Sequence, residues 1–343
     1  MSEPTDHPRL REWAAYGLSK ATAALFTYLP WGISRGLAEC LAEAWREVQE
    51  KSRKRALQNV QGAFPNLSRA QQQRIVKGAY RSVFRGAVDA LQFRRRVQSG
   101  AWKALLDVEG MELLDGCDDD RGLIFASGHF GCWELIGLAL GPMGFPLTTV
   151  MRPPRNPLLA RHLRELREVG GQQVVGKRGA LRHLLSVLRD GGNVGFLIDR
   201  DARGDGMFVD FLGNPASTHT SIARLSIRTR APIAFIYAHE KPGEKRFSIR
   251  ISDIVHPRPQ ADENDEVFRI LQRLTKDLEQ IIRQHPDRWM WTQNRWKTYP
   301  GKLSGNEKPK PGILRRTRNP GADARLRQGP EAAAEERTGT LKQ

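Results

Sequence analysis

The sequence predicts an α/β protein, and this prediction rests on three observations. Short apolar runs bounded by turn-forming residues begin at residue 122 and read as β-strands. Helical patterns separate these runs, as in a sheet whose strands are joined by crossover helices. A last pattern over residues 265–284 places its aliphatic side chains on one stripe with a period of about 3.6 residues, which is typical of a helix that packs on a sheet.

The sequence predicts five strands and five helices between residues 122 and 284. The expected strands cover residues 122–127, 147–151, 193–199, 233–238 and 247–255. The expected helices cover residues 131–142, 156–169, 179–190, 219–230 and 265–284. The stripe of the last helix comprises Val267, Ile270, Leu271, Leu274, Leu278, Ile281 and Ile282. We assign residues 101–300 to this α/β domain.

The N-terminal region, residues 1–100, is predicted to be helical and membrane-associating. Its segment 13–34 has one charged residue, Lys20, among 22 residues. That length suits a membrane span of about 20 residues, but Ser, Thr, Gly and Pro30 dilute its apolar character. Its aromatic residues cluster toward both ends, as at a membrane interface. We expect a helix that lies in the interface or spans the membrane marginally; the alternative is an amphipathic core helix.

Two basic runs follow in the same helical region. The first lies within residues 51–55, and the second is Arg94, Arg95 and Arg96. A charge run usually forms a solvated helix face. After a membrane-seeking segment it equally suits binding to anionic lipid headgroups. The sequence leaves both interpretations open.

The net charge of +17 predicts an anionic partner, such as nucleic acid, an anionic membrane surface or an acidic protein. Residues 301–343, predicted to be a disordered basic tail, hold ten basic and five acidic residues, so the rest of the chain still carries +12. The three cysteines show no ligand spacing and indicate a reducing compartment. Neither a metal site nor a cofactor motif is expected.

The chemistry is predicted at a turn between an apolar strand and a helix, around His129. Gly128 and Gly131 flank this histidine and permit a tight turn. Such a turn lies at the carboxyl ends of the strands, where open α/β sheets bind ligands. A histidine there suits general-base chemistry on an alcohol, and Glu134, one turn into the helix, is expected to orient it.

The stretch from His129 to Glu134 resembles the HxxxxE motif of the late lipid A biosynthesis (lauroyl/myristoyl) acyltransferase family. This family lies within the lysophospholipid acyltransferase superfamily, which also includes phosphatidylinositol mannoside acyltransferases. Further blocks are similar in the same order, although Met151 replaces a usual tyrosine and Gln293 a usual histidine. These blocks are residues 55–65, 151–159, 196–201, 208–218 and 289–298.

This resemblance implies a glycerolipid-acyltransferase-like sheet with flanking helices and gives roles to further residues. His129 and Glu134 are the expected catalytic pair. Arg167 is expected to steady an oxyanion or an anionic substrate group, or else to be one basic residue of an arginine-rich helix. The other expected substrate-binding residues are Arg152, for a phosphate, and Asp199 and Asp201. One of these two aspartates is expected to support His129 or a site arginine; the alternative is that they merely cap a loop.

The expected function is therefore transfer of a fatty acyl chain from an acyl carrier protein or coenzyme A thioester to a hydroxyl of a lipid A precursor. The expected location is the cytoplasmic face of the inner membrane. Another lipid acceptor, such as a phospholipid or glycolipid, is the alternative. A non-catalytic membrane scaffold is disfavoured because His129 and Glu134 are intact, and a nucleic-acid-binding protein because its motifs are missing.

Overall fold

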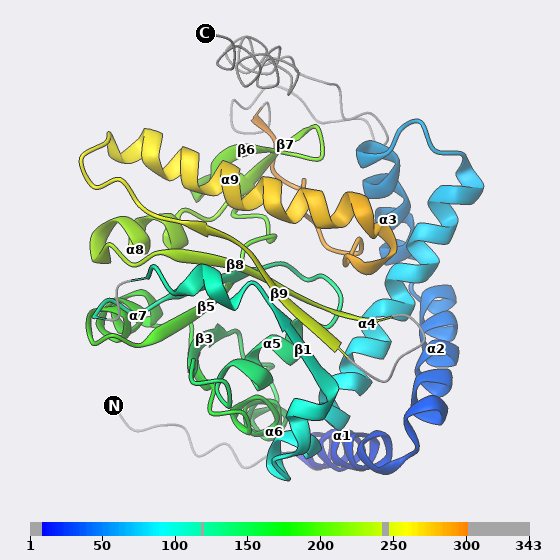
Figure 1. Ribbon diagram of the computed structural model, residues 1–343. Coiled ribbons are helices and arrows are strands. Elements are labelled where there is room, and N and C mark those ends of the chain that lie inside the picture. The colour runs from blue at the N-terminus through cyan, green and yellow to red at the C-terminus, as the bar shows by residue number, and fades with distance from the viewer. Residues whose placement is uncertain (1–8, 118–119, 242–246, 301–343) are drawn as a thin grey trace, which may run out of the picture. The chain divides into compact units, whose positions relative to one another are not determined.

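The computed structural model describes residues 9–117, 120–241 and 247–300 (Figure 1). Its α-helices are α1 (Leu10–Tyr28), α2 (Trp31–Val48), α3 (Glu50–Ala63), α4 (Arg69–Gln98), α5 (Trp133–Leu140), α6 (Pro157–Glu168), α7 (Ala180–Arg189), α8 (Ser221–Thr229) and α9 (Glu263–Gln284). Short 3₁₀ helices are η1 (Ala101–Leu105), η2 (Met111–Leu114), η3 (Arg203–Asp205) and η4 (Pro286–Arg288). The strands are β1 (Leu106–Glu109), β2 (Ile124–Ser127), β3 (Leu147–Met151), β4 (Gln173–Gly176), β5 (Asn193–Leu197), β6 (Met207–Phe211), β7 (Asn214–Thr218), β8 (Ile233–Glu240) and β9 (Phe247–Val255).

A seven-stranded sheet of order β1-β9-β8-β2-β5-β3-β4 forms the centre of the fold. Strands β8, β2, β5, β3 and β4 are parallel, whereas β9 runs antiparallel to β8 and pairs in parallel with β1. The α/β prediction is confirmed, and the sheet is mostly parallel. The order puts β5 directly beside β2, so the segments that follow these two strands meet at one edge.

Alternating side chains of the central strands enter two separate cores. Ile124 and Ala126 face a core that contains residues of α7, α8 and α9, whereas Phe125 faces a core built on α5. Figure 1 shows α9 along one side of the sheet and α5 on the other. All seven predicted stripe residues of α9 are buried, so that prediction is confirmed.

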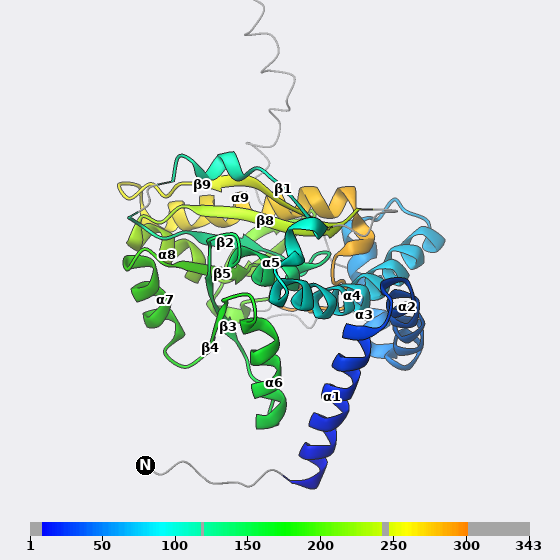
Figure 2. The same ribbon diagram turned by 60° about the horizontal axis from the view of Figure 1, so that its bottom comes forward.

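The N-terminal helices share these cores with the sheet. Ala56 and Val60 of α3 and Val76 and Tyr80 of α4 belong to the same core as the strands β2 and β8. The described residues of the predicted regions 1–100 and 101–300 thus lie in one compact unit. The helical backbone is interrupted at Leu29 and Pro30, which separate α1 from α2. Helix α1 contacts α4 and α6, and Figure 2 shows it extending beside α6.

No helix in the part of the chain that the structure describes combines the length and apolarity of a membrane span. The predicted disordered tail, residues 301–343, lies outside the described residues.

A buried ionic cluster connects α2 and α4 to the turn after β2. Asp89 on α4 is fully buried and accepts a hydrogen bond from Nε1 of Trp31 at 3.1 Å. Its other oxygen lies 3.8 Å from Sγ of Cys132, and Arg35 and Arg85 interact with it electrostatically. Burial raises the pKa of Asp89 to about 6, because the attraction of Arg35 and the hydrogen bond of Trp31 offset only part of the desolvation.

We expect Asp89→Asn to change how stability depends on pH. The folded pKa lies above the ordinary value of 3.8, so the folded state holds the proton longer than the unfolded chain. The contribution of Asp89 to the free energy of unfolding therefore falls by about 3 kcal/mol as pH rises from about 4 to about 7. Urea unfolding at several pH values should show this fall in the wild type and lose it in the variant. An Asp115→Asn control at an exposed site should titrate like the wild type, and an unchanged profile in Asp89→Asn would contradict the assignment.

Candidate active site

The turn after β2 fixes the backbone of His129 at the carboxyl edge of the sheet. At Gly128 an added Cβ would lie 2.7 Å from Cδ1 of Leu278, so α9 leaves no room for a side chain. Gly131 has a φ of +54°, and a Cβ there would lie 2.4 Å from the carbonyl oxygen of Ala238. The peptide N–H of Met290 also donates to the carbonyl oxygen of His129 at 3.0 Å. The turn is therefore held by α9, β8 and the chain after η4.

The side chain of His129 pairs with Asp199, which follows the neighbouring strand β5. Nδ1 of His129 lies 2.7 Å from Oδ1 of Asp199, and the peptide N–H of His129 donates to Oδ2 at 2.8 Å. This arrangement corrects the expectation that Glu134 orients the histidine. Glu134 lies on α5, whereas β5 brings a carboxylate to the Nδ1 side of the ring.

Asp199 is buried and receives four hydrogen bonds. Besides the two from His129, Nε1 of Trp289 donates to Oδ2 at 2.8 Å and Nε2 of Gln293 donates to Oδ2 at 2.9 Å. Burial alone would raise the pKa of Asp199, but the charge and hydrogen bonds of His129 and the hydrogen bond of Gln293 outweigh it. The pKa of Asp199 therefore lies well below its ordinary value. Its ionised form favours the tautomer of His129 that carries its proton on Nδ1, so the lone pair lies on Nε2.

Glu134 instead pairs with Arg167 from the last turn of α6. Nε of Arg167 donates to Oε2 of Glu134 at 2.9 Å, and Nη2 donates to Oε1. Each side chain is about a third exposed. Trp133 links this pair to the histidine, because its Nε1 lies 3.3 Å from Oε1 of Glu134 and its ring centroid lies 5.4 Å from that of His129. The pair thus borders the site without a hydrogen bond to His129.

Arg200 lies at the open side of the histidine ring. Its Nη2 is 3.4 Å from Nε2 of His129, and its side chain is exposed. A guanidinium at this position lies beside the atom that would take up a substrate proton. The sequence analysis did not single out this residue.

The remaining predicted site residues, Arg152 and Asp201, are not hydrogen-bonded to His129 within the described part of the chain and lie at two different positions. Arg152, at the end of β3, lies at the same edge two strands from β2, and its side chain is exposed. Asp201 accepts hydrogen bonds from the peptide N–H and the hydroxyl of Thr298 at 3.3 and 3.0 Å. Its carboxylate therefore holds Thr298, near the end of the described chain.

The block after η4 supplies two further residues to which the sequence analysis gave no role in the site. Trp289 and Gln293 donate to Asp199, and Asn59 of α3 holds this segment through the carbonyl oxygens of Trp291 and Gln293 at 2.8 and 2.9 Å. Arg295 is buried and donates to Ser217 and Thr218, so it packs the segment and does not face a membrane. The dense aromatic block at 289–296 was the available signal, but its partner Asp199 lies about ninety residues away in the sequence.

A buried carboxylate, an imidazole and an adjacent guanidinium at the carboxyl edge of an α/β sheet define an acid–base site suited to group transfer to an alcohol. Residues 4–298 match the family described as bacterial lipid A biosynthesis acyltransferase. The chain belongs to this family and is an O-acyltransferase.

Individual relatives are distant. A lipid A biosynthesis acyltransferase of Haemophilus influenzae is 20% identical over 248 residues, which cover 71% of this chain and 74% of that protein. A lipid A biosynthesis palmitoleoyltransferase of Escherichia coli K12 is 24% identical over 284 residues, covering 80% and 89%. A phosphatidylinositol mannoside acyltransferase of Mycolicibacterium smegmatis is 28% identical over 197 residues, covering 56% and 62%.

Proposed function

We propose that this enzyme transfers a fatty acyl group from a thioester donor to a hydroxyl of a lipid A-type acceptor, with His129 as the general base. The observation that carries the proposal is the pair of His129 and the buried Asp199, 2.7 Å apart, at the ligand-binding edge of the sheet. The names of the Haemophilus and Escherichia relatives support the acceptor class.

The proposed reaction is a direct transfer without an acyl-enzyme. Nε2 of His129 takes the proton of the acceptor hydroxyl as its oxygen attacks the thioester carbonyl carbon. The tetrahedral intermediate then expels the thiolate, which receives the proton from the imidazolium. Asp199 stabilises that imidazolium and holds its tautomer. The products are an ester and a free thiol, so the histidine returns to its starting form.

The developing oxyanion needs a positive group close to Nε2. Arg167 was the expected candidate, but Glu134 binds it through two hydrogen bonds. Arg200 is 3.4 Å from Nε2 and has no acidic partner among the described residues. We therefore assign the oxyanion to Arg200, and the Glu134–Arg167 pair to shaping the site through Trp133.

The charge and the exposed apolar residues support a proposal for the donor and the location. Arg152 and Arg200 are exposed at the edge beside His129 and suit the phosphate of a carrier-protein phosphopantetheine or of coenzyme A. Trp13, Leu18 and Leu25 of α1 are exposed apolar side chains, and the basic run Arg94–Arg96 ends the adjoining helix α4. We propose that these helices dock on an anionic membrane surface, the cytoplasmic face of the inner membrane.

Mass spectrometry of lipids from a deletion strain tests the function. We expect lipid A to lose one secondary acyl chain and to regain it when the wild-type gene is restored, with the protein in the membrane fraction. Unchanged lipid A with a deficit in another acylated lipid would favour the second candidate, a different acceptor. The phosphatidylinositol mannoside acyltransferase among the relatives is the observation behind that candidate. No change in any lipid would contradict both.

A further inference from the structure

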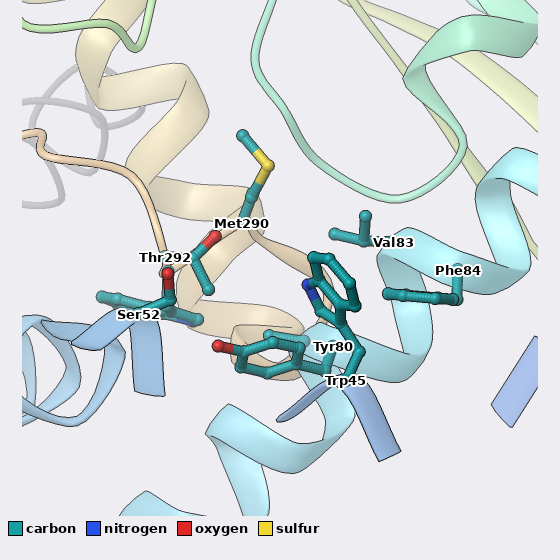
Figure 3. A pocket seen from close by; sticks show the side chains of 9 residues that line it. Trp45, Ser52, Tyr80, Val83, Phe84, Met290 and Thr292 are labelled. Atoms are coloured by element: carbon teal, nitrogen blue, oxygen red, sulfur yellow. The ribbon is translucent and has the colours of Figure 1, made fainter. Parts of the chain in front are cut away.

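A pocket away from the His129–Asp199 pair lies between α2, α3, α4 and the segment after η4 (Figure 3). Its volume of ≈ 100 Å³ lies below the range of about 300–1,000 Å³ that is usual for small-molecule sites, so it has room for one end of a ligand and not for a whole lipid. Trp45, Val83 and Phe84 form much of its apolar wall, and Met290 closes it on the side of the C-terminal segment. Nothing in the proposed reaction uses this space.

The pocket contains a buried hydroxyl without a partner. Tyr80 is 5% exposed, and its Oη has no hydrogen-bond partner among the described residues. In Figure 3 the hydroxyl is directed toward the side of the pocket on which Ser52 lies. A buried hydroxyl without a partner costs free energy, so a ligand that accepts its hydrogen bond is favoured.

Three arginines act electrostatically on this hydroxyl. Burial raises the pKa of Tyr80, and the charges of Arg53, Arg46 and Arg55 act in the opposite direction, which places three guanidinium groups near the phenol. Arg46 pairs with Glu43 and Glu47, and Arg53 pairs with Glu47, whereas Arg55 donates to the carbonyl oxygen of Thr292. The polar end of the pocket therefore suits an anion.

The apolar end of the pocket is continuous with an exposed stripe of α2. Ile33, Leu37, Leu41 and Trp45 follow one another at intervals of four residues on one helix face, and all four are exposed. Trp45 also lines the pocket. A hydrocarbon chain that lies along this stripe thus meets the pocket at its end.

We propose that this pocket is a second lipid site, which binds a long-chain carboxylate with its head near Tyr80 and the arginines and its chain against Trp45 and Phe84. The site goes beyond the proposed acyl transfer. It contacts the catalytic centre through one segment, because Met290, Trp291 and Thr292 line the pocket while the peptide N–H of Met290 holds His129 and the flanking Trp289 and Gln293 hold Asp199. Occupation of the pocket therefore stabilises the segment that positions the catalytic pair.

Fluorescence quenching by 9,10-dibromostearate tests the site, because bromine on the chain quenches tryptophans that it touches. Trp45 and Trp291 line the pocket, so we expect saturable quenching of the full-length protein. Trp45→Phe should reduce the quenched fraction, whereas Trp102→Phe, in the other core, should not. Ser52→Phe fills the pocket from α3 and should weaken binding about tenfold or more, since displacing two methylene groups from an apolar site has that effect. The control Ser52→Ala should bind like the wild type.

Two outcomes would overturn the proposal. Equal quenching in Ser52→Phe and in the wild type would mean that the probe binds elsewhere, and Val83→Phe provides a second blocked variant if Ser52→Phe does not fold. Displacement of the probe by an acyl thioester donor would mean that the pocket belongs to the catalytic site. The His129→Ala variant should bind the probe normally, so this proposal and the proposed function fail independently.

Discussion

Replacing His129 with alanine is expected to lower kcat/KM for acyl transfer by about 100- to 10,000-fold, the usual range for loss of a general base. The expectation follows from Nε2, which is the basic nitrogen left free when Asp199 binds Nδ1. The loss should fall on kcat more than on KM, since the imidazole acts on the proton in transit. Initial rates with purified protein, a radiolabelled acyl thioester and a lipid A-type acceptor measure it.

The control for this variant is another histidine outside the site. His183 lies exposed on α7, and His183→Ala should keep wild-type rates. His129→Ala should also keep its folded circular dichroism spectrum. If the folded variant retained more than about a tenth of the wild-type kcat/KM, the general-base assignment would be wrong.

The second large effect is expected for Asp199→Asn, which should reduce kcat by about 1,000- to 10,000-fold, as loss of the carboxylate does in serine-protease triads. The amide cannot hold the same tautomer of His129 or stabilise the imidazolium. The low pKa of Asp199 keeps the carboxylate ionised from pH 5 to pH 9, so the deficit should persist across that range. Rate profiles against pH measure this.

Glu134→Gln tests whether Asp199, as the structure shows, or Glu134, as the sequence predicted, supports His129. Glu134 and Arg167 are each about a third exposed, so loss of their ion pair is expected to cost less than about tenfold in kcat/KM. Initial rates of Glu134→Gln and Asp199→Asn under identical conditions show which of the two carboxylates contributes more to activity. If Glu134→Gln were as damaging as Asp199→Asn, the sequence-based expectation would be right and the role assigned to Asp199 would be too large.

Local patterns were enough to predict most of the fold. The five apolar runs became β2, β3, β5, β8 and β9, because buried parallel strands have continuous apolar sequences. The pattern did not reveal β1, β4 or the hairpin β6–β7. The first two have four residues each and lie at the sheet edges, where half-exposed side chains weaken the apolar signal.

The site was predicted only as far as neighbours in sequence allow. The strand–turn–helix around His129 is local, and the sequence identified it. Its partner was assigned to Glu134, five residues on. Asp199 was expected only as one of two aspartates that support His129 or a site arginine, because strand order cannot be read from one sequence. The pairing of β2 with β5 decides the matter, since it brings Asp199 to His129 across seventy residues. Gln293 was noted only as a departure from the family, although it binds Asp199.

The contacts of the segment after η4 also bear on the order in which the enzyme becomes complete during synthesis. The ribosome makes His129 and Asp199 well before Trp289 and Gln293, which supply two of the four hydrogen bonds to the Asp199 carboxylate. Without those residues, burial of the Asp199 carboxylate would leave half of its donors missing, which is costly. The final stretch of the described chain is therefore needed to complete the hydrogen bonds to Asp199. A product that ends before residue 289 carries the strands of the sheet together with His129 and Asp199, yet lacks two donors that stabilise their arrangement.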